Sequence, residues 1–120
     1  MRTMLTQVRS LIEGAAGTAR VFHAWPADWS RVPCVAYREE ENRTYARADG
    51  AEALTELVYA VDVWALGAKE ARDLLGEIDE ALCDAGFART QATTLFEDRT
   101  RFFHISARYR VLTDGEGVYQ

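Results

Sequence analysis

The chain has 120 residues, which suits one ordinary domain, and 48% of them are hydrophobic while 28% are charged. This balance is typical of a chain that folds rather than one that stays disordered. The formal net charge of −5 argues against a protein that holds nucleic acid through its phosphates, because such binding needs a basic face. No apolar run approaches the ~20 residues of a transmembrane helix. The first residues also lack a secretory pattern, so we expect no membrane contact.

The first third of the chain is predicted to hold a helix, a short apolar piece and the start of a strand. Apolar residues recur at helical spacing over residues 1–14, which indicates an amphipathic helix. The short apolar piece follows at residues 19–24. Pro33 precedes the apolar segment 34–38, and proline suits the first position of a strand because it cannot donate to the ladder.

Two tryptophans, Trp25 and Trp29, flank a Pro-Ala-Asp sequence with the composition of a loop. Large aromatic side chains on a loop suit either the core or an interface anchor, and the sequence leaves both interpretations open. Trp64 lies within an apolar strand and is expected in the core. The candidate interface residues are Trp25, Trp29, Tyr45 and Tyr119.

The chain becomes polar over residues 39–53. Glu39-Glu40-Glu41 is a compact acidic run, and Asp49-Gly50 is a strong signal for a two-residue hairpin turn. We interpret this region as a hairpin that projects from the sheet; a disordered excursion is the alternative. Consecutive carboxylates on an extended segment point alternately to opposite faces, so we expect a charge patch here rather than a metal site.

A long strand followed by a helix forms the centre of the predicted fold. Apolar residues on one face of segment 57–65 indicate a strand whose surface is largely covered. Gly67 ends this strand, and an apolar stripe at helical spacing then runs from Ala71 to Ala85. Gly86 stands where a left-handed cap suits the end of the helix.

The last third of the chain is predicted to form two strands and a tail. Residues 87–96 make a polar strand, residues 97–100 a turn, and residues 103–111 alternate between apolar and polar as in a half-buried strand. The fold class is therefore α+β, with a mostly antiparallel sheet of four to five strands and two helices packed on one face. Residues 1–112 are expected to form a single domain, and the polar residues 113–120 a tail that is flexible unless a partner holds it.

Few residues have the spacing of a catalytic or metal site. The chain lacks a glycine-rich phosphate loop and a nucleophile elbow, and His23 and His104 are isolated in the sequence. Cys34 and Cys83 have no metal-ligand spacing, and we expect two buried, reduced thiols. We predict no catalytic residue, no metal and no cofactor.

The order of elements resembles the tail-completion, or tail-terminator, proteins of long-tailed phages and related prophage particles. The resemblance covers residues 1–112. It rests on the proline-opened strand after a short helix, on Val61-Asp62-Val63-Trp64 running into a helix, and on the closing strand 103–111. The tryptophan pair and the residues beyond 112 depart from the pattern.

The resemblance implies a non-enzymatic structural protein of the virion, made in the host cytoplasm. Such a protein forms a homo-oligomeric ring, usually of six copies, at the head-proximal end of the tail tube. Its partners are the tail tube protein and a neck or head-completion protein, and DNA passes through its central channel without specific binding. An acidic wall would let DNA slide past, and the candidate channel-lining residues are Glu39, Glu40, Glu41 and Asp49, with Glu52 and Glu56 at the start of the long strand.

Three other functions remain open from the sequence. One is another ring of the head–tail connector. A second is an acidic binding module or inhibitor that recognises a basic partner. The third is a small cytosolic enzyme that uses Cys34 or a histidine with nearby carboxylates, which would require a spatial adjacency that sequence does not show.

Overall fold

The computed structural model describes residues 1–28 and 31–120. Trp29, one of the candidate interface residues, lies outside this part. The elements in chain order are α1 (Leu5–Ala15), β1 (Arg20–His23), β2 (Cys34–Ala48), β3 (Ala51–Ala65), α2 (Ala68–Asp84), β4 (Ala88–Glu97) and β5 (Phe102–Thr113). Among the described residues, no helix is long and apolar enough to cross a membrane.

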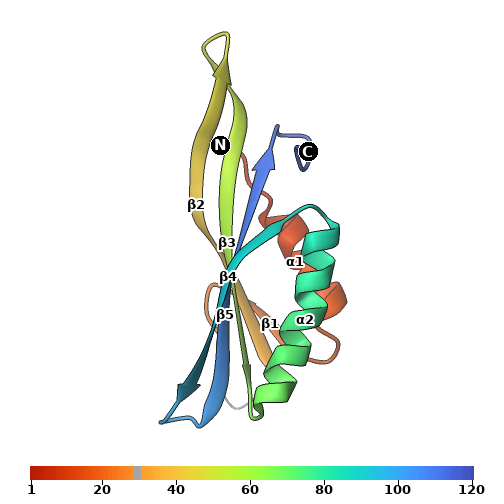
Figure 1. Ribbon diagram of the computed structural model, residues 1–120, viewed down its shortest axis with the longest axis vertical. Helices are drawn as coiled ribbons and strands as arrows, with labels where there is room; N and C mark the ends of the chain where they lie inside the picture. The colour runs from red at the N-terminus through yellow and green to blue at the C-terminus, as the bar shows by residue number, and fades with distance from the viewer. Residues whose placement is uncertain (29–30) are drawn as a thin grey trace.

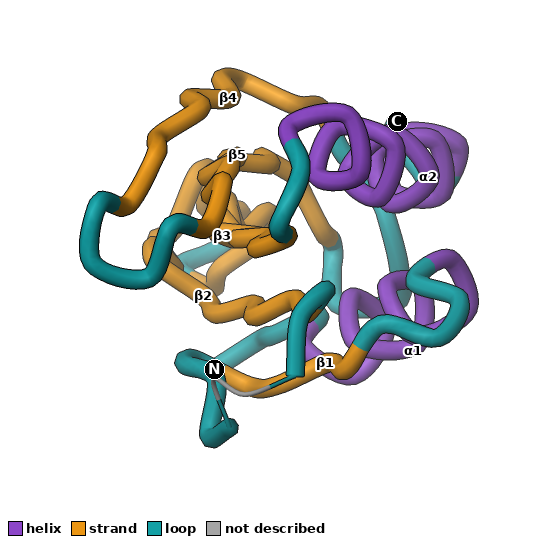
Figure 2. The backbone as a smooth tube through the Cα atoms, turned by 90° about the horizontal axis from the view of Figure 1, so that it is seen from below, coloured by secondary structure: helices purple, strands orange, loops and turns teal. Residues whose placement is uncertain are grey.

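The described strands form one five-stranded sheet in the order β1-β2-β3-β5-β4, with both helices on the same face (Figures 1 and 2). β1 pairs with β2 in parallel, while the other neighbouring strands pair antiparallel. The predicted α+β class, with a mostly antiparallel sheet and helices on one face, is confirmed. The molecule is elongated along the strands, with extents of 53 × 24 × 22 Å.

The core lies between the helices and the central strands. From β3 it takes the predicted face, which includes Leu57, Tyr59, Val61, Val63 and Ala65. From α2 it takes the apolar stripe, with Ala71, Leu75, Ile78 and Leu82 buried. Gly86 adopts a φ of 98°, and Phe87 N donates to Leu82 O at 3.0 Å, which is the predicted left-handed cap.

The projecting hairpin is confirmed, and β2 and β3 form it. Asp49 and Gly50 have φ values of 53° and 78°, as the tight turn at its tip requires. β5 pairs with β3 only as far as Thr55, so the tip extends past the rest of the sheet (Figure 1). Arg2 braces the hairpin close to its tip, since the guanidinium donates at 3.0 Å to the carbonyls of Ala53 and Glu52.

The residues after β5 fold back toward the body of the molecule. Thr113 forms a β-bridge with Val118, and Tyr119 N donates to Leu112 O at 2.8 Å. Val118 packs against the core, and a Cβ on Gly86 would lie 2.7 Å from its side chain. These contacts belong to the isolated chain, and the flexibility expected for residues 113–120 stays a prediction.

One expectation about burial is wrong. Cys34 is buried, as predicted, but Cys83 is exposed. Residue 83 lies on α2 beside the apolar stripe rather than within it, so its side chain stays exposed next to Asp79 and the start of β4. Burial of Cys83 was expected because free cysteines are usually buried, but its position outside the apolar stripe of α2 leaves it exposed.

Candidate functional site

The acidic run at the base of the hairpin divides between the two faces of the sheet. Glu39 lies on the helix-covered face, where Thr3 Oγ1 and Tyr59 OH donate to its Oε1 at 2.6 and 2.9 Å. Glu40 lies on the other face, between Arg38 at 2.9 Å and Arg108 at 2.7 Å. Glu39 and Glu40 alternate as expected, but a register shift between Glu39 and Glu41 pairs Glu41 with Val58, so the alternation does not continue to the third carboxylate. Two of these three acids serve contacts within the chain.

The carboxylates nearer the tip differ in whether other side chains of the chain hold them. Glu41 and Asp49 are exposed, and neither forms a hydrogen bond or salt bridge with a described residue. Glu52 accepts from Thr44 Oγ1 at 2.9 Å. Glu56 is only 4% exposed and is held by Arg43 and Arg110. Glu41 and Asp49 are therefore the candidate channel residues whose charge remains available to a partner.

A buried carboxylate organises the helix-free face of the sheet. Asp62 accepts from Arg38 and from His104 Nε2, each at 2.8 Å, and only 4% of its side chain is exposed. Burial raises the pKa of Asp62, but hydrogen bonds from His104, Ser106 and Arg38 outweigh that effect and leave the pKa below its ordinary value. The ring of His104 stacks on Trp64 with 4.4 Å between centroids.

This cluster contains Asp62, His104 and Ser106, the residue types of a hydrolytic triad, but in another arrangement. In a triad the histidine lies between the acid and the nucleophile. Here Asp62 is the shared partner of His104 and Ser106, and Arg108 donates to Ser106 Oγ at 2.6 Å. The geometry is that of an ion network that satisfies a buried charge.

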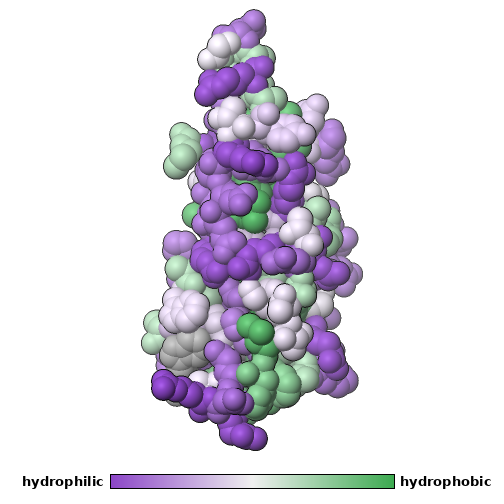
Figure 3. All heavy atoms as spheres, turned by 60° about the vertical axis from the view of Figure 1, so that its left-hand side comes forward, coloured by the Kyte–Doolittle hydropathy of each residue, from purple (hydrophilic) through white to green (hydrophobic). Residues whose placement is uncertain are grey.

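Near the end of the molecule opposite the hairpin, exposed apolar side chains lie close to the charged β4–β5 turn, residues 98–101. Figure 3 shows a hydrophobic area near this end, below bands of hydrophilic side chains. Trp25, Leu66 and Phe96, which we call the apolar end, are 59%, 66% and 44% exposed. The ring of Trp25 meets Trp64 edge-on at 5.8 Å. The neighbouring Leu95, on the outermost strand β4, is 48% exposed.

The sequence interpretation missed Leu66, Leu95 and Phe96. Leu95 and Phe96 close a strand that is otherwise polar, and Leu66 stands alone between a strand and a glycine. An apolar residue at the end of a polar strand was the available signal. Of the other candidate interface residues, Tyr45 is 53% and Tyr119 is 51% exposed, and Arg110 lies over the ring of Tyr45.

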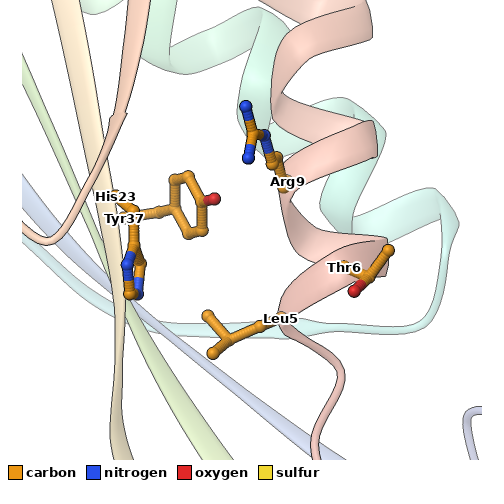
Figure 4. Close-up of a pocket in the computed structure, with 5 residues that line it drawn as sticks. All are labelled: Leu5, Thr6, Arg9, His23 and Tyr37. Carbon is orange, nitrogen blue, oxygen red and sulfur yellow. The ribbon is translucent and has the colours of Figure 1, made fainter.

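A shallow pocket of about 300 Å³ lies between α1 and the edge formed by β1 and β2. Figure 4 shows Leu5 and Arg9 of α1 facing Tyr37 and His23 of the strands. The rings of His23 and Tyr37 lie 5.3 Å apart. Within residues 1–28 and 31–120, no three metal-ligating side chains come together as a metal site.

The two thiols differ in setting but not in ionisation. Burial, followed by the charge of Asp28, raises the pKa of Cys34 to about 11. Burial and then Asp79 also raise the pKa of Cys83. Since the thiolate is the reactive form, neither side chain is activated as a nucleophile at neutral pH.

The comparisons with known proteins give the chain its family. The family model described as "Tail completion protein gp17" matches residues 2–114. The chain belongs to this family. Its members are structural proteins of the phage tail, so the chain is a tail component of a virion.

A solved structure shares the fold. The chain is similar to a chain in the virion of a native gene transfer agent particle, with a TM-score of 0.62 and 16% sequence identity. The similarity covers 86% of this chain and 88% of that one. No curated protein sequence matches the chain. In a tail completion protein, the hairpin, the helix-free face and the apolar end are candidate contact surfaces.

Proposed function

We propose that the chain caps the head-proximal end of a phage tail tube as a ring of copies, ends tube growth there and leaves a central passage for DNA. The observation that carries this proposal is the match of the tail-completion family to residues 2–114. Six copies is the number that the resemblance to tail-terminator proteins implies. The neck protein would bind the face of the ring that points away from the tube.

The shape of the subunit supports this role. Its long axis separates a charged hairpin from the apolar end, so the two ends of each copy offer different chemistry (Figure 1). A joint between two unlike structures needs such a difference, because the tube and the neck present different surfaces. We assign the apolar end, Trp25, Leu66 and Phe96, to a contact with one of these neighbours.

The hairpin would border the DNA passage. Glu41 and Asp49 keep exposed charges, and a ring repeats each of them once per copy. Repeated carboxylates repel a polyanion and prevent retention of DNA by phosphate contacts. Glu39 and Glu40 are less suited to this task because their oxygens are engaged by Tyr59 and by Arg108.

The test is to mix the purified protein with tails that lack it and to image them. We expect added density at one end of each tail, and a mass for the bound protein that is a whole multiple of the 13.5 kDa chain. Leu66→Asp/Phe96→Asp should reduce capping, because it places charge on the apolar end. Arg72→Glu, on the exposed side of α2, makes the same change of net charge, so it is the matched control and should cap normally. Tails that bind no protein at either end would contradict the proposal.

A further inference from the structure

The sheet has two outer edges, and neither is paired with another described strand. At one edge, every residue of β4 from Ala88 to Phe96 is exposed. Residues 90–96 carry no charge. Proteins usually blunt such an edge with charges or a very short strand, because it can pair with another chain. At the opposite edge lies β1, a strand of 4 residues.

Parts of the two outer edges lie in the same rows of residues, at the same level along the strand direction. Strand pairing gives continuous rows of residues across all five strands. One row consists of Leu95, His104, Trp64, Cys34 and Arg20. The row of Ala92 likewise ends at His23 on β1. The exposed segment Ala92–Leu95 is therefore level with Arg20–His23.

The two edge strands also run in opposite directions. β4 is antiparallel to β5, β5 to β3 and β3 to β2, whereas β1 is parallel to β2. In a ring whose axis lies along the strands, every copy stands at the same height. The β4 edge of one copy then meets the β1 edge of the next copy, level and antiparallel.

We propose that neighbouring copies of this chain join by strand addition, with Ala92–Leu95 of β4 paired to Arg20–His23 of the next copy. This inference rests on the ring of the proposed function. A ring closed by such a contact is heterologous, with each copy using two different surfaces. Closure also leaves no β4 edge open for misassembly.

On each edge a charged side chain has no salt bridge with a described residue, although the guanidinium of Arg20 lies over the ring of Phe22, and this favours the contact. Glu97 Oε1 is buried without a hydrogen-bond partner among the described residues. Arg20 is exposed and forms no salt bridge with a described carboxylate. In the proposed register Arg20 lies opposite Leu95 and diagonal to Glu97, on the helix-free face. Long side chains reach such diagonal neighbours, so Arg20 of one copy would pair with Glu97 of the next.

The free part of β2 above β1 is a poorer partner for β4. Register shifts interrupt its pairing with β3 between Glu39 and Glu41 and between Thr44 and Arg47. Bulges and charges are devices that protect an edge from strand addition. Segment 38–48 has both, whereas residues 90–96 lack charge. The unprotected edge is β4, and the level edge available to it is β1.

Cysteine cross-linking on capped tails tests the register. In a Cys34→Ala/Cys83→Ser background, which also removes the native thiol paired with residue 20, Leu95→Cys/Arg20→Cys and Ala92→Cys/His23→Cys place thiols in matching rows of adjacent copies. Oxidised glutathione should convert both variants into covalent oligomers on a non-reducing gel. Within one copy, β1 and β4 are about 19 Å apart at ~4.8 Å per strand, which is too far for a disulfide.

The control recombines the same substitutions. Ala92→Cys/Arg20→Cys offsets the thiols by three rows, or about 10 Å, so it should stay monomeric on the gel. Capped tails without cross-links in either matching pair, or with equal cross-links in the offset pair, would overturn the strand contact while the ring stands. Tails that the unsubstituted protein leaves uncapped would overturn the proposed function itself.

Charge-exchange variants test the ion pair between copies without introduced cysteines. Arg20→Glu and Glu97→Arg should each weaken capping roughly tenfold, since each brings like charges together between copies. The double variant Arg20→Glu/Glu97→Arg should restore capping, because the pair is re-formed with reversed signs. Single variants that cap normally, or a double variant that is no better than the singles, would remove this pair from the contact.

Discussion

The two faces of the sheet show how one set of strands serves two purposes. On the helix-covered face, β3 contributes a continuous apolar surface that includes Tyr59, Val61 and Val63. On the helix-free face, the intervening positions carry Asp62 and Glu56, each held by basic partners. The larger core therefore lies on the helix-covered face, while the helix-free face combines a smaller buried cluster of Cys34, Ala36 and Trp64 with the ion network.

This difference also fixes the register of the sheet. A shift of one residue in β3 would exchange Val61 and Val63 for Asp62, placing a carboxylate under the helices. The ion network would lose its central acceptor at the same time. The contrast between the faces is thus a specificity device as well as a division of labour, and the following variants test it in order of expected effect.

The largest effect is expected in the helix-covered core. Ile78 and Leu82 are 0% and 1% exposed. Truncation of either to alanine should lower the free energy of unfolding by about 2–5 kcal/mol, because it removes buried methyl groups and leaves a cavity. Urea unfolding monitored by circular dichroism measures the loss. Glu80→Ala, on the exposed side of the same helix, is the control; an equal loss in both would mean that the helix faces are assigned wrongly.

An intermediate effect is expected on the helix-free face. Asp62→Asn leaves Arg38 and His104 beside a neutral amide in a buried site, and we expect a loss of about 1–3 kcal/mol. Glu40→Gln makes the same change of charge between two arginines, but 29% of the Glu40 side chain is exposed, against 4% for Asp62. Its loss should be smaller because water screens the exposed pair. Equal losses would show that burial does not distinguish the two sites.

Acid should weaken the same network. Burial raises the pKa values of Asp62 and Glu56, but their hydrogen bonds to basic partners leave both below the usual range. A depressed pKa contributes stability that is complete above the unfolded value of about 4 and is lost as pH falls through the folded value. Wild-type protein should therefore lose stability below about pH 4. Below that pH, the difference in free energy of unfolding between wild type and Asp62→Asn should disappear, as measured by urea titrations at several pH values. A difference that stays constant with pH would contradict this assignment.

The sequence predicts the parts of this fold whose signals are local. The alternation of residues 103–111 and the stripe on α2 each report one period and one buried face, and both are confirmed. The Asp49-Gly50 turn likewise follows from the backbone preferences of two residues. Such elements carry their own pattern, so no distant partner is needed to recognise them.

The contacts of the candidate site could not be predicted in this way. Glu40 reaches Arg108, and Glu39 reaches Thr3, across strands and helices that the sequence does not place side by side. The pairing of β1 with β2 is non-local as well, because a short apolar piece does not name its neighbour. These contacts separate the bound acids, Glu39 and Glu40, from the free ones, which sequence reasoning had grouped together.

The smallest effect on stability, and the most specific effect on function, is expected at the hairpin. Glu41→Lys/Asp49→Lys reverses two exposed charges that have no salt-bridge partner among the described residues, so the fold should unfold at the same urea concentration as wild type. In a ring the reversal places basic side chains around the DNA passage, where they would bind phosphates and slow the movement of the DNA. DNA ejection from particles should become slower and more dependent on salt, as measured by nuclease-accessible DNA against time.

The control, Glu77→Lys/Glu80→Lys, makes the same change of net charge on the outer side of α2, and particles that carry it should eject DNA normally. Normal ejection by the hairpin variant would place the passage elsewhere, whereas slow ejection by both variants would assign the effect to net charge alone.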